Sequence, residues 1–115
     1  LAIEIYEKPI LDIEVEILNG CGVPGLAEKV SNYLRSQKMD VVRSDNADHY
    51  NYDQTILILR NENFEGLKKV SQSFGINEQD ELRIKHIPDE QLSVDITVII
   101  GSDFDTIKPL VDYLK

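Results

Sequence analysis

The 115-residue chain has no tryptophan, one methionine and one cysteine, Cys21. With a single thiol it cannot form an internal disulfide, so an apolar core must stabilise it. Apolar runs are short, and none approaches the roughly 20 residues of a membrane-spanning helix. No basic leader with a long apolar stretch follows Leu1, so no signal peptide is visible. Because the chain begins with leucine rather than methionine, we expect it to be a piece of a longer protein.

Basic residues are also scarce. Twelve Lys and Arg stand against 21 Asp and Glu, which gives a net charge of −9. Nucleic acids and anionic lipids attract clustered positive charge, so neither is expected as a partner. The apolar share of 42% is typical of a globular domain and not of a disordered chain.

Hydrophobic periodicity predicts one α/β domain over residues 11–115, with a lead-in over residues 1–10. Ile13, Val15 and Ile17 alternate with acidic residues, which predicts a strand with one wet face and a sheet whose helices lie mainly on one side. Further strands are expected at 39–43, 55–59, 82–87 and 94–100, and helices at 24–38, 64–74 and 106–114. The order β-α-β-β-α-β-β plus a short C-terminal helix predicts a two-layer α+β sandwich with a mixed sheet and the first and last strands central. Arg83 and Lys85 would face the acidic residues of the first strand.

Gly20, Gly22 and Gly25 spell G-x-G-x-x-G between a predicted strand and a predicted helix, the context of a dinucleotide-binding turn. Pro24 at the first helical position removes one of the N–H groups that a phosphate needs. The later order of elements also departs from the doubly wound pattern. The alternative is that these glycines only make a tight turn and a close contact between helix and sheet.

No group of residues in the sequence supports a catalytic or metal-binding role. His49 lies near Asp45, Asp48 and Asp53, but that polar loop, residues 44–53, lacks the glycine of a calcium loop and the extra His or Cys of a zinc site.

Catalytic candidates are equally isolated. Cys21 has no base that the sequence places beside it, and His86 sits on a strand without a partner. Ser102 lacks the nucleophile-elbow pattern, and acidic residues such as Asp103 are favourable at a helix start. We therefore expect no enzyme activity, no metal and no cofactor.

Three segments carry a resemblance to a known family. The stretch 13–27 contains Leu18-Asn19-Gly20-Cys21-Gly22 and Gly25-Leu26-Ala27, residues 46–48 read Asn-Ala-Asp, and residues 95–104 end in Gly101-Ser102-Asp103-Phe104. Together they resemble the LytR C-terminal domain family of bacterial cell-envelope proteins over residues 11 to 104. Cys21 departs from the family pattern, which usually has Thr or Ser there, so this chain has a thiol in place of that hydroxyl.

The resemblance implies an extracytoplasmic domain attached to a membrane-anchored protein through a segment missing from this chain, with an accessory role in envelope assembly. The LytR-CpsA-Psr catalytic domain that often accompanies the family is absent from this sequence, so its transfer chemistry does not carry over. The family is also described as a transcriptional attenuator, but the acidic charge argues against contact with DNA.

Polar residues follow several predicted strands. If the first and last strands are parallel neighbours, their C-terminal ends form an edge where α/β proteins often bind ligands. We expect there a shallow polar site for cell-wall glycan, a peptide stem or an envelope protein, made of Asn19, Gly20, Cys21, Gly22, Asn46, Gly101, Ser102 and Asp103. The alternative is that these residues only cap strands and turn the chain.

Three functions therefore stand side by side. The first is a non-catalytic binding module of a cell-envelope protein. The second is a nucleotide-binding domain that uses the glycine turn, and the third is a structural interaction domain whose edge strand pairs with another chain.

Overall fold

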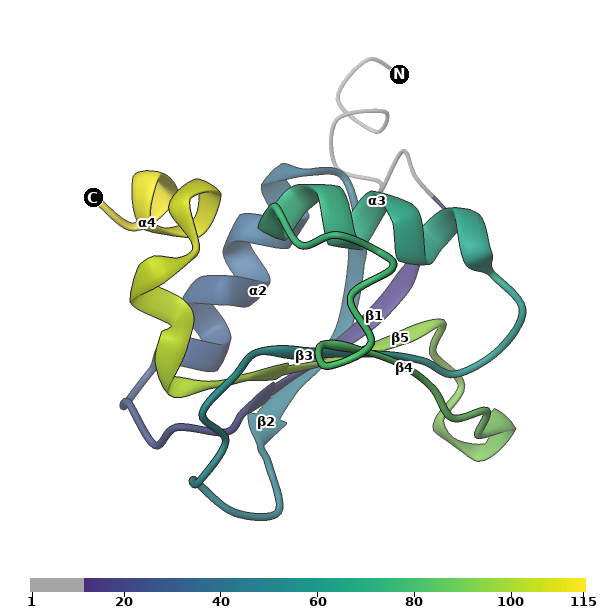
Figure 1. Ribbon diagram of the computed structural model, residues 1–115, viewed down its shortest axis with the longest axis horizontal. Coiled ribbons are helices and arrows are strands. Elements are labelled where there is room, and N and C mark those ends of the chain that lie inside the picture. The colour runs from purple at the N-terminus through teal and green to yellow at the C-terminus, as the bar shows by residue number, and fades with distance from the viewer. Residues whose placement is uncertain (1–11) are drawn as a thin grey trace, which may run out of the picture.

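The computed structural model describes residues 12–115, so the predicted lead-in over residues 1–10 and Leu11 lie outside the described residues. Helices pack beside a five-stranded mixed sheet (Figure 1). The predicted α/β class and order of elements are confirmed. In chain order the elements are β1 (Glu14–Asn19), α2 (Leu26–Ser36), β2 (Asp40–Asn46), β3 (Ile56–Leu59), α3 (Phe64–Phe74), β4 (Ile84–His86), the 3₁₀ turn η1 (Glu90–Leu92), β5 (Ile96–Ile100), the 3₁₀ turn η2 (Ser102–Thr106) and α4 (Lys108–Leu114).

The strand order across the sheet is β2-β1-β5-β3-β4. β1 runs parallel to both β2 and β5, β3 runs antiparallel to β5, and β4 runs parallel to β3. The first and last strands are therefore parallel neighbours inside the sheet, as the site hypothesis required. β2 and the short β4 form the two edges.

Alternate strand residues share one core with the three helices. Val15 and Ile17 of β1 belong to the same buried cluster as Val30 of α2, Val70 of α3 and Leu110 of α4. Burial of these side chains is the main stabilising contribution, at about 25 cal/mol for each Å² of apolar surface removed from water. The shared core agrees with helices lying mainly on one face, which stays a prediction.

Local capping explains the bounds of α3, which the sequence predicted correctly. The Asn63 side chain accepts a hydrogen bond from the Gly66 N–H at 2.9 Å and so caps the first turn. Gly75 ends the helix with φ 64°, a left-handed conformation that glycine adopts without strain.

Several predicted bounds were wrong. β2 continues to Asn46, whereas the polar residues 44–46 had been assigned to a loop; they pair with β1 at the edge of the sheet, where the outer side meets solvent and tolerates polar side chains. Pro24 lies before α2, which begins at Leu26 after Gly25 in the left-handed conformation. The last helix starts only at Lys108, because Pro109 belongs in a first turn and the preceding residues form η2.

Glu16 is the largest departure from the expected wet face of β1, because it is only 5% exposed. Its carboxylate accepts hydrogen bonds from the Thr97 hydroxyl at 2.6 Å and from Arg43 Nε at 3.0 Å. Arg60 Nε donates to the same Thr97 hydroxyl at 3.0 Å. A polar row thus crosses β2, β1, β5 and the end of β3, and it shields the acidic side chain that the alternating pattern had placed in water.

The predicted pairing of Arg83 and Lys85 with the acidic residues of β1 is also wrong. β4 lies next to β3, and β5 separates β3 from β1. Arg43, on the edge strand next to β1, takes the position opposite Glu16 instead.

Candidate functional site

The C-terminal ends of β1, β2 and β5 meet at one edge of the molecule. Asn19 pairs with Ile100 on one side and with Asn46 on the other. Beyond the strands, the Gly20 N–H donates to the Ile100 carbonyl at 2.8 Å. The structure therefore brings the predicted residues Asn19, Gly20, Asn46 and the start of the Gly101 segment together.

The Asn19 side chain points into its own turn. It is 5% exposed, and its Oδ1 accepts hydrogen bonds from the backbone N–H groups of Cys21 at 3.1 Å and Gly22 at 2.9 Å. Its Nδ2 donates to the Val23 carbonyl at 2.7 Å. An asparagine that bonds to the backbone two or three residues ahead stabilises a turn, so this amide group supports the chain rather than facing outward.

The glycines of the G-x-G-x-x-G segment have packing and backbone roles. A Cβ at Gly20 would lie 2.7 Å from the Tyr52 ring, and a Cβ at Gly22 would lie 3.2 Å from the Tyr50 ring. Gly25 has open space around it but adopts φ 74°, which favours glycine. Two tyrosine rings thus occupy the positions over the turn, while the N–H groups of Cys21 and Gly22 already bond to Asn19.

Asp103 is held by a different set of partners from Asn19. Its Oδ1 accepts hydrogen bonds from the Thr55 N–H at 2.9 Å and the Thr55 hydroxyl at 2.8 Å, and its Oδ2 accepts from Arg83. Its side chain is 13% exposed. A Cβ at Gly101 would overlap the backbone of Gln54. This part of the predicted site therefore fixes β3 and β4 to the end of β5.

The loop between β2 and β3 closes over these strand ends. The Tyr52 N–H donates to the Gly20 carbonyl at 3.1 Å, and the Ser102 N–H donates to the Tyr52 carbonyl at 2.8 Å. In Figure 1 this loop projects from the end of β2, beside the turn that follows β1. The predicted residues form the support of the surface, and the loop forms its outer layer.

The outer layer carries aromatic side chains that the sequence reasoning had assigned only to a polar loop. We call residues 48–52 the aromatic loop. The His49 and Tyr52 rings stack with their centroids 4.3 Å apart and their planes within 5°. Tyr50 is 51% exposed, although one side of its ring lies against Gly22. One sequence signal could have indicated this surface: residues 48–52 contain two tyrosines and a histidine but show no apolar periodicity. Aromatic side chains outside any periodic helix or strand are not expected to enter the core.

Electrostatics hold the aromatic loop together. The Tyr52 hydroxyl donates to Asp48 Oδ1 at 2.8 Å. This bond lowers the pKa of Asp48 from its ordinary value, because the hydrogen bond favours the ionised carboxylate. It also raises the pKa of Tyr52, because the donated proton is retained beside the acid. At neutral pH the loop therefore carries a fixed negative charge next to its rings.

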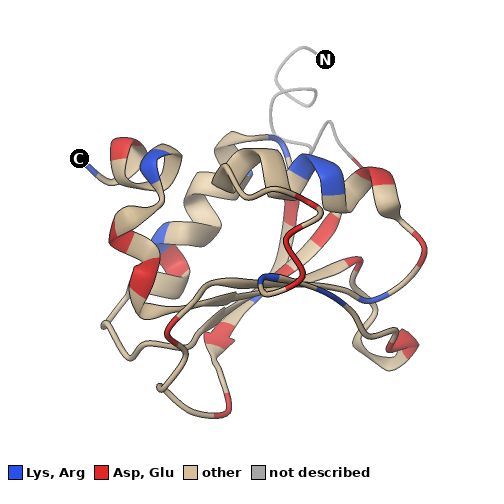
Figure 2. Ribbon diagram, viewed as in Figure 1, with Lys and Arg blue, Asp and Glu red and all other residues tan. Residues whose placement is uncertain are grey.

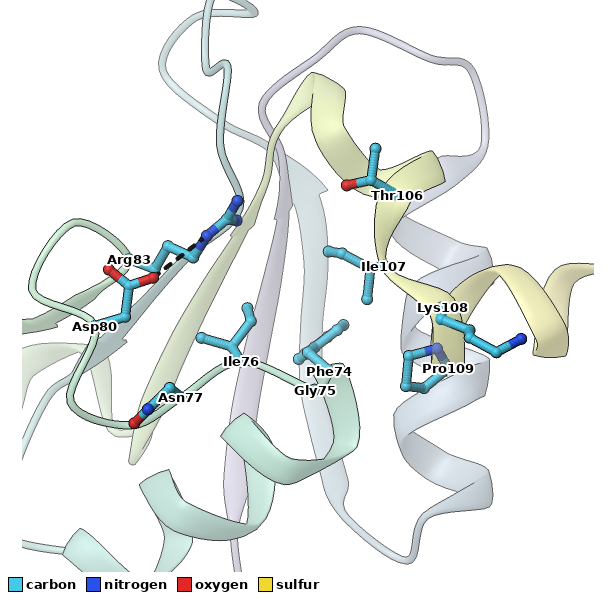
Figure 3. A pocket seen from close by; sticks show the side chains of 10 residues that line it. All are labelled: Phe74, Gly75, Ile76, Asn77, Asp80, Arg83, Thr106, Ile107, Lys108 and Pro109. Carbon is cyan, nitrogen blue, oxygen red and sulfur yellow. Dashed lines mark ion pairs between the residues drawn. The ribbon is translucent and has the colours of Figure 1, made fainter.

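A hollow of about 400 Å³ lies elsewhere, between the end of α3 and the start of α4 (Figure 3). Residues 74–77 and 106–109 line it together with Asp80 and Arg83. The Arg83 side chain reaches Asp80 at 3.7 Å and also bonds to Asp103. Because two carboxylates of the protein already pair with this guanidinium, its charge is neutralised within the protein.

Charge and metal chemistry add little to the site. In Figure 2 the basic residues are spread over the helices and the sheet among acidic ones, and the adjacent Lys68 and Lys69 lie together on α3. Within residues 12–115, no three His, Cys, Asp or Glu side chains gather as a metal ion would require. Among the helices of that same region, none has the length and apolar character to cross a membrane. Cys21 is a free, partly buried thiol whose Sγ lies 3.6 Å from Asn19 Oδ1.

The family described as LytR cell envelope-related transcriptional attenuator matches residues 12–104. No curated protein and no solved structure matches the chain. The matched range begins just before β1 and ends within η2, so it includes the glycine turn, the aromatic loop and Asp103. Since it also covers most of the sequence, the resemblance in the strand-end motifs is confirmed, and this chain belongs to the LytR_C family of cell-envelope-related domains.

Proposed function

We propose that this chain is a non-catalytic accessory domain of a cell-envelope protein and that it binds cell-wall glycan or a wall-assembly partner. The contact surface is the aromatic loop together with the glycine turn, residues 20–25, on which it rests. The observation that carries the proposal is the half-exposed Tyr50 ring, which the chain seats on Gly22 at the C-terminal edge of the sheet. Ligands of α/β sheets tend to bind at this edge.

The bonding of the polar residues supports a role in binding rather than catalysis. The Asn19 amide group forms hydrogen bonds through both its oxygen and its nitrogen to the backbone of its own turn. Both carboxylate oxygens of Asp103 accept hydrogen bonds, one from Thr55 and the other from Arg83. A catalytic acid or base has to reach the proton that it transfers on the substrate. These groups instead preorganise the surface that the loop presents.

The family membership supports a position outside the cytoplasm, attached to a membrane-anchored protein. In that position the domain would hold its parent protein close to the wall material on which envelope assembly proceeds. Even weak contacts become effective there, because tethering to a surface raises the local concentration of binding sites.

Co-sedimentation of the purified chain with intact peptidoglycan sacculi tests the proposal. We expect saturable binding that persists on sacculi stripped of their anionic polymers. NAD and ATP serve as controls in a thermal-shift assay, and neither should raise the melting temperature. Absence of binding to sacculi, together with clear stabilisation by a nucleotide, would overturn the proposal in favour of a nucleotide site at the glycine turn.

A structural interaction role has one observation in its favour, because β2 is an edge strand with residues 42–46 exposed. An exposed edge can pair with a strand of another chain. The irregular register opposite Val15 and Glu16, together with the charged residues Arg43 and Asp45, works against such pairing. Light scattering over a range of concentrations decides this point, since edge pairing between copies predicts a mass that grows with concentration.

A further inference from the structure

We infer that the aromatic loop is a sugar-stacking platform that selects neutral, N-acetylated sugars of the wall glycan over its anionic polymers. The inference rests on the proposed function and names the class of ligand that the strand-end surface takes. Tyr50 provides the stacking face, and the polar residues Asp48 and Asn51 are close to it in the sequence of the loop.

Tyr50 has a position that core packing does not explain. Its ring lies against Gly22, yet 51% of the residue remains exposed, and it is not part of the buried core cluster. Val23, also exposed, follows Gly22 directly in the turn. A flat ring supported from behind offers the apolar face against which the C–H groups of a pyranose pack, while polar groups at its rim receive the hydroxyls.

Hydrogen bonds and ring stacking hold the platform in place without a ligand. Tyr52 connects the loop to Gly20 and to Ser102 by backbone hydrogen bonds. His49 stacks on the Tyr52 ring, and its Nδ1 accepts a hydrogen bond from the Asn51 N–H at 3.1 Å. A loop that is already ordered loses little conformational freedom on binding, which is a main cost in weak carbohydrate recognition.

The charge around the platform selects the ligand. Asp45, Asp48 and Asp53 flank the rings, and residues 44–55 contain no Lys or Arg. Phosphate or carboxylate groups on a polymer would be repelled by these carboxylates, and the loop offers no Lys or Arg to pair with them. A neutral sugar avoids this repulsion, and its hydroxyl and acetamido N–H groups can donate to the carboxylate and amide oxygens.

The size of the platform favours a sugar over a folded protein. Stable protein interfaces bury at least roughly 1,000 Å² and are built around several buried anchors. Within the aromatic loop and the glycine turn, the large exposed apolar side chains are Tyr50 and Val23. That area matches one or two sugar rings, with an affinity on the order of millimolar for a short oligomer.

The test is a titration of the full chain with short soluble oligomers of N-acetylglucosamine, followed by NMR. We expect shifts at the aromatic loop and the glycine turn, and a roughly tenfold weaker affinity for Tyr50→Ala. Tyr50→Phe, which keeps the ring, should bind as the wild type does. Phe64→Ala is the matched control, because Phe64 is a comparably exposed aromatic residue at the start of α3 and its loss should leave binding unchanged.

Soluble teichoic acid, a phosphate-bearing polymer, tests the selection and should produce no shifts at the loop. Binding of the sugar oligomer that is unaffected by Tyr50→Ala, or shifts centred on another surface, would overturn the inference. The same variant on sacculi separates the two levels of the proposal. Saturable binding that Tyr50→Ala leaves intact removes the platform but keeps wall binding as the proposed function. Wild-type protein that fails to bind sacculi removes wall binding itself, and the platform with it.

Discussion

Replacing Asn19 by alanine should destabilise the protein, because this side chain is the internal support of the strand-end surface. The substitution removes two hydrogen bonds accepted by Oδ1 and one donated by Nδ2. Each such bond contributes about 1 kcal/mol net, so the expected loss is about 2–3 kcal/mol. Solvent can reach Gly22 and Val23 and hydrate the released backbone groups, which keeps the loss below that of a fully buried site.

Urea denaturation followed by circular dichroism measures this loss, and the m-value should stay unchanged because the same surface is exposed on unfolding. A loss of this size lowers the melting temperature by roughly 10 °C in a domain of this length. Asn19→Asp is the informative comparison, since a carboxylate keeps the acceptor for the Cys21 and Gly22 N–H groups but replaces the donor to Val23 with a second oxygen. It should also lose stability, because that charged oxygen would lie against the Val23 carbonyl at a position that is 5% exposed.

Two outcomes would refute the reasoning on Asn19. An alanine variant within about 0.5 kcal/mol of the wild type would show that the turn does not depend on this amide group. A folded alanine variant that no longer binds sacculi, at a temperature where the fraction folded is unchanged, would assign Asn19 to the ligand. We expect binding to fall only as far as the folded fraction falls.

Three further predictions test the fold. Gly20→Ala should lower the free energy of unfolding by about 1–3 kcal/mol, because the added Cβ overpacks the site. Gly25→Ala should lower it by about 1 kcal/mol, from the left-handed backbone alone. If urea denaturation finds Gly25→Ala to be the less stable variant, the packing role of Gly20 is contradicted. Glu16→Ala should lose about 2–4 kcal/mol because Arg43 and the neighbouring hydroxyl lose their acceptor. Arg43→Ala should lose at least as much, because it leaves the buried Glu16 carboxylate without its charged partner, whereas the 45% exposed Arg43 can be hydrated when Glu16 is removed; a much smaller loss for Arg43→Ala in chemical denaturation would be inconsistent with the polar row. Burial raises the pKa of Tyr33 from its ordinary 10.0, so its contribution to stability is fully present below pH 10 and is lost as the pH rises through the higher folded-state value. Tyr33→Phe should show a smaller alkaline decline in melting temperature than the wild type, the remainder coming from groups such as Tyr52 whose pKa is also raised; an identical decline in both proteins would refute the assignment.

Local patterns were sufficient for most of the architecture. α3 was predicted over residues 64–74 because its apolar spacing and Gly75 mark both the buried face and the end. β3 and β5 were predicted from their β-branched runs within one or two residues. In these segments most of the side chains that form the pattern are buried, with Phe64 at the start of α3 as an exposed exception, so the sequence pattern largely predicts burial.

Patterns failed where a neighbouring strand changed the environment of a residue. Glu16 fits a wet face by alternation, but Thr97 and Arg43 arrive beside it from β5 and β2 and exclude water. Residues 44–46 have the composition of a loop, yet they extend β2 because β1 offers unpaired backbone groups next to them. The residues that change these environments are distant in sequence from Glu16 and from residues 44–46, so no local sequence pattern could predict the contacts.

For the candidate site as well, the sequence predicted one part and the tertiary contacts determined the other. The sequence placed Asn19, Gly101 and Asn46 near one edge, because parallel neighbours end together. It did not show that the loop after β2 folds back over that edge, with Tyr52 on Gly20 and Tyr50 on Gly22.

The sequence by itself determined the α/β class, the order of the elements and the family, because periodicity, turn glycines and motif spacing are local properties of the chain. Only the tertiary structure decided which side chains face outward at the strand ends. That choice depends on long-range contacts between the glycine turn, the aromatic loop and the segment after β5, which the sheet brings together from three distant parts of the sequence.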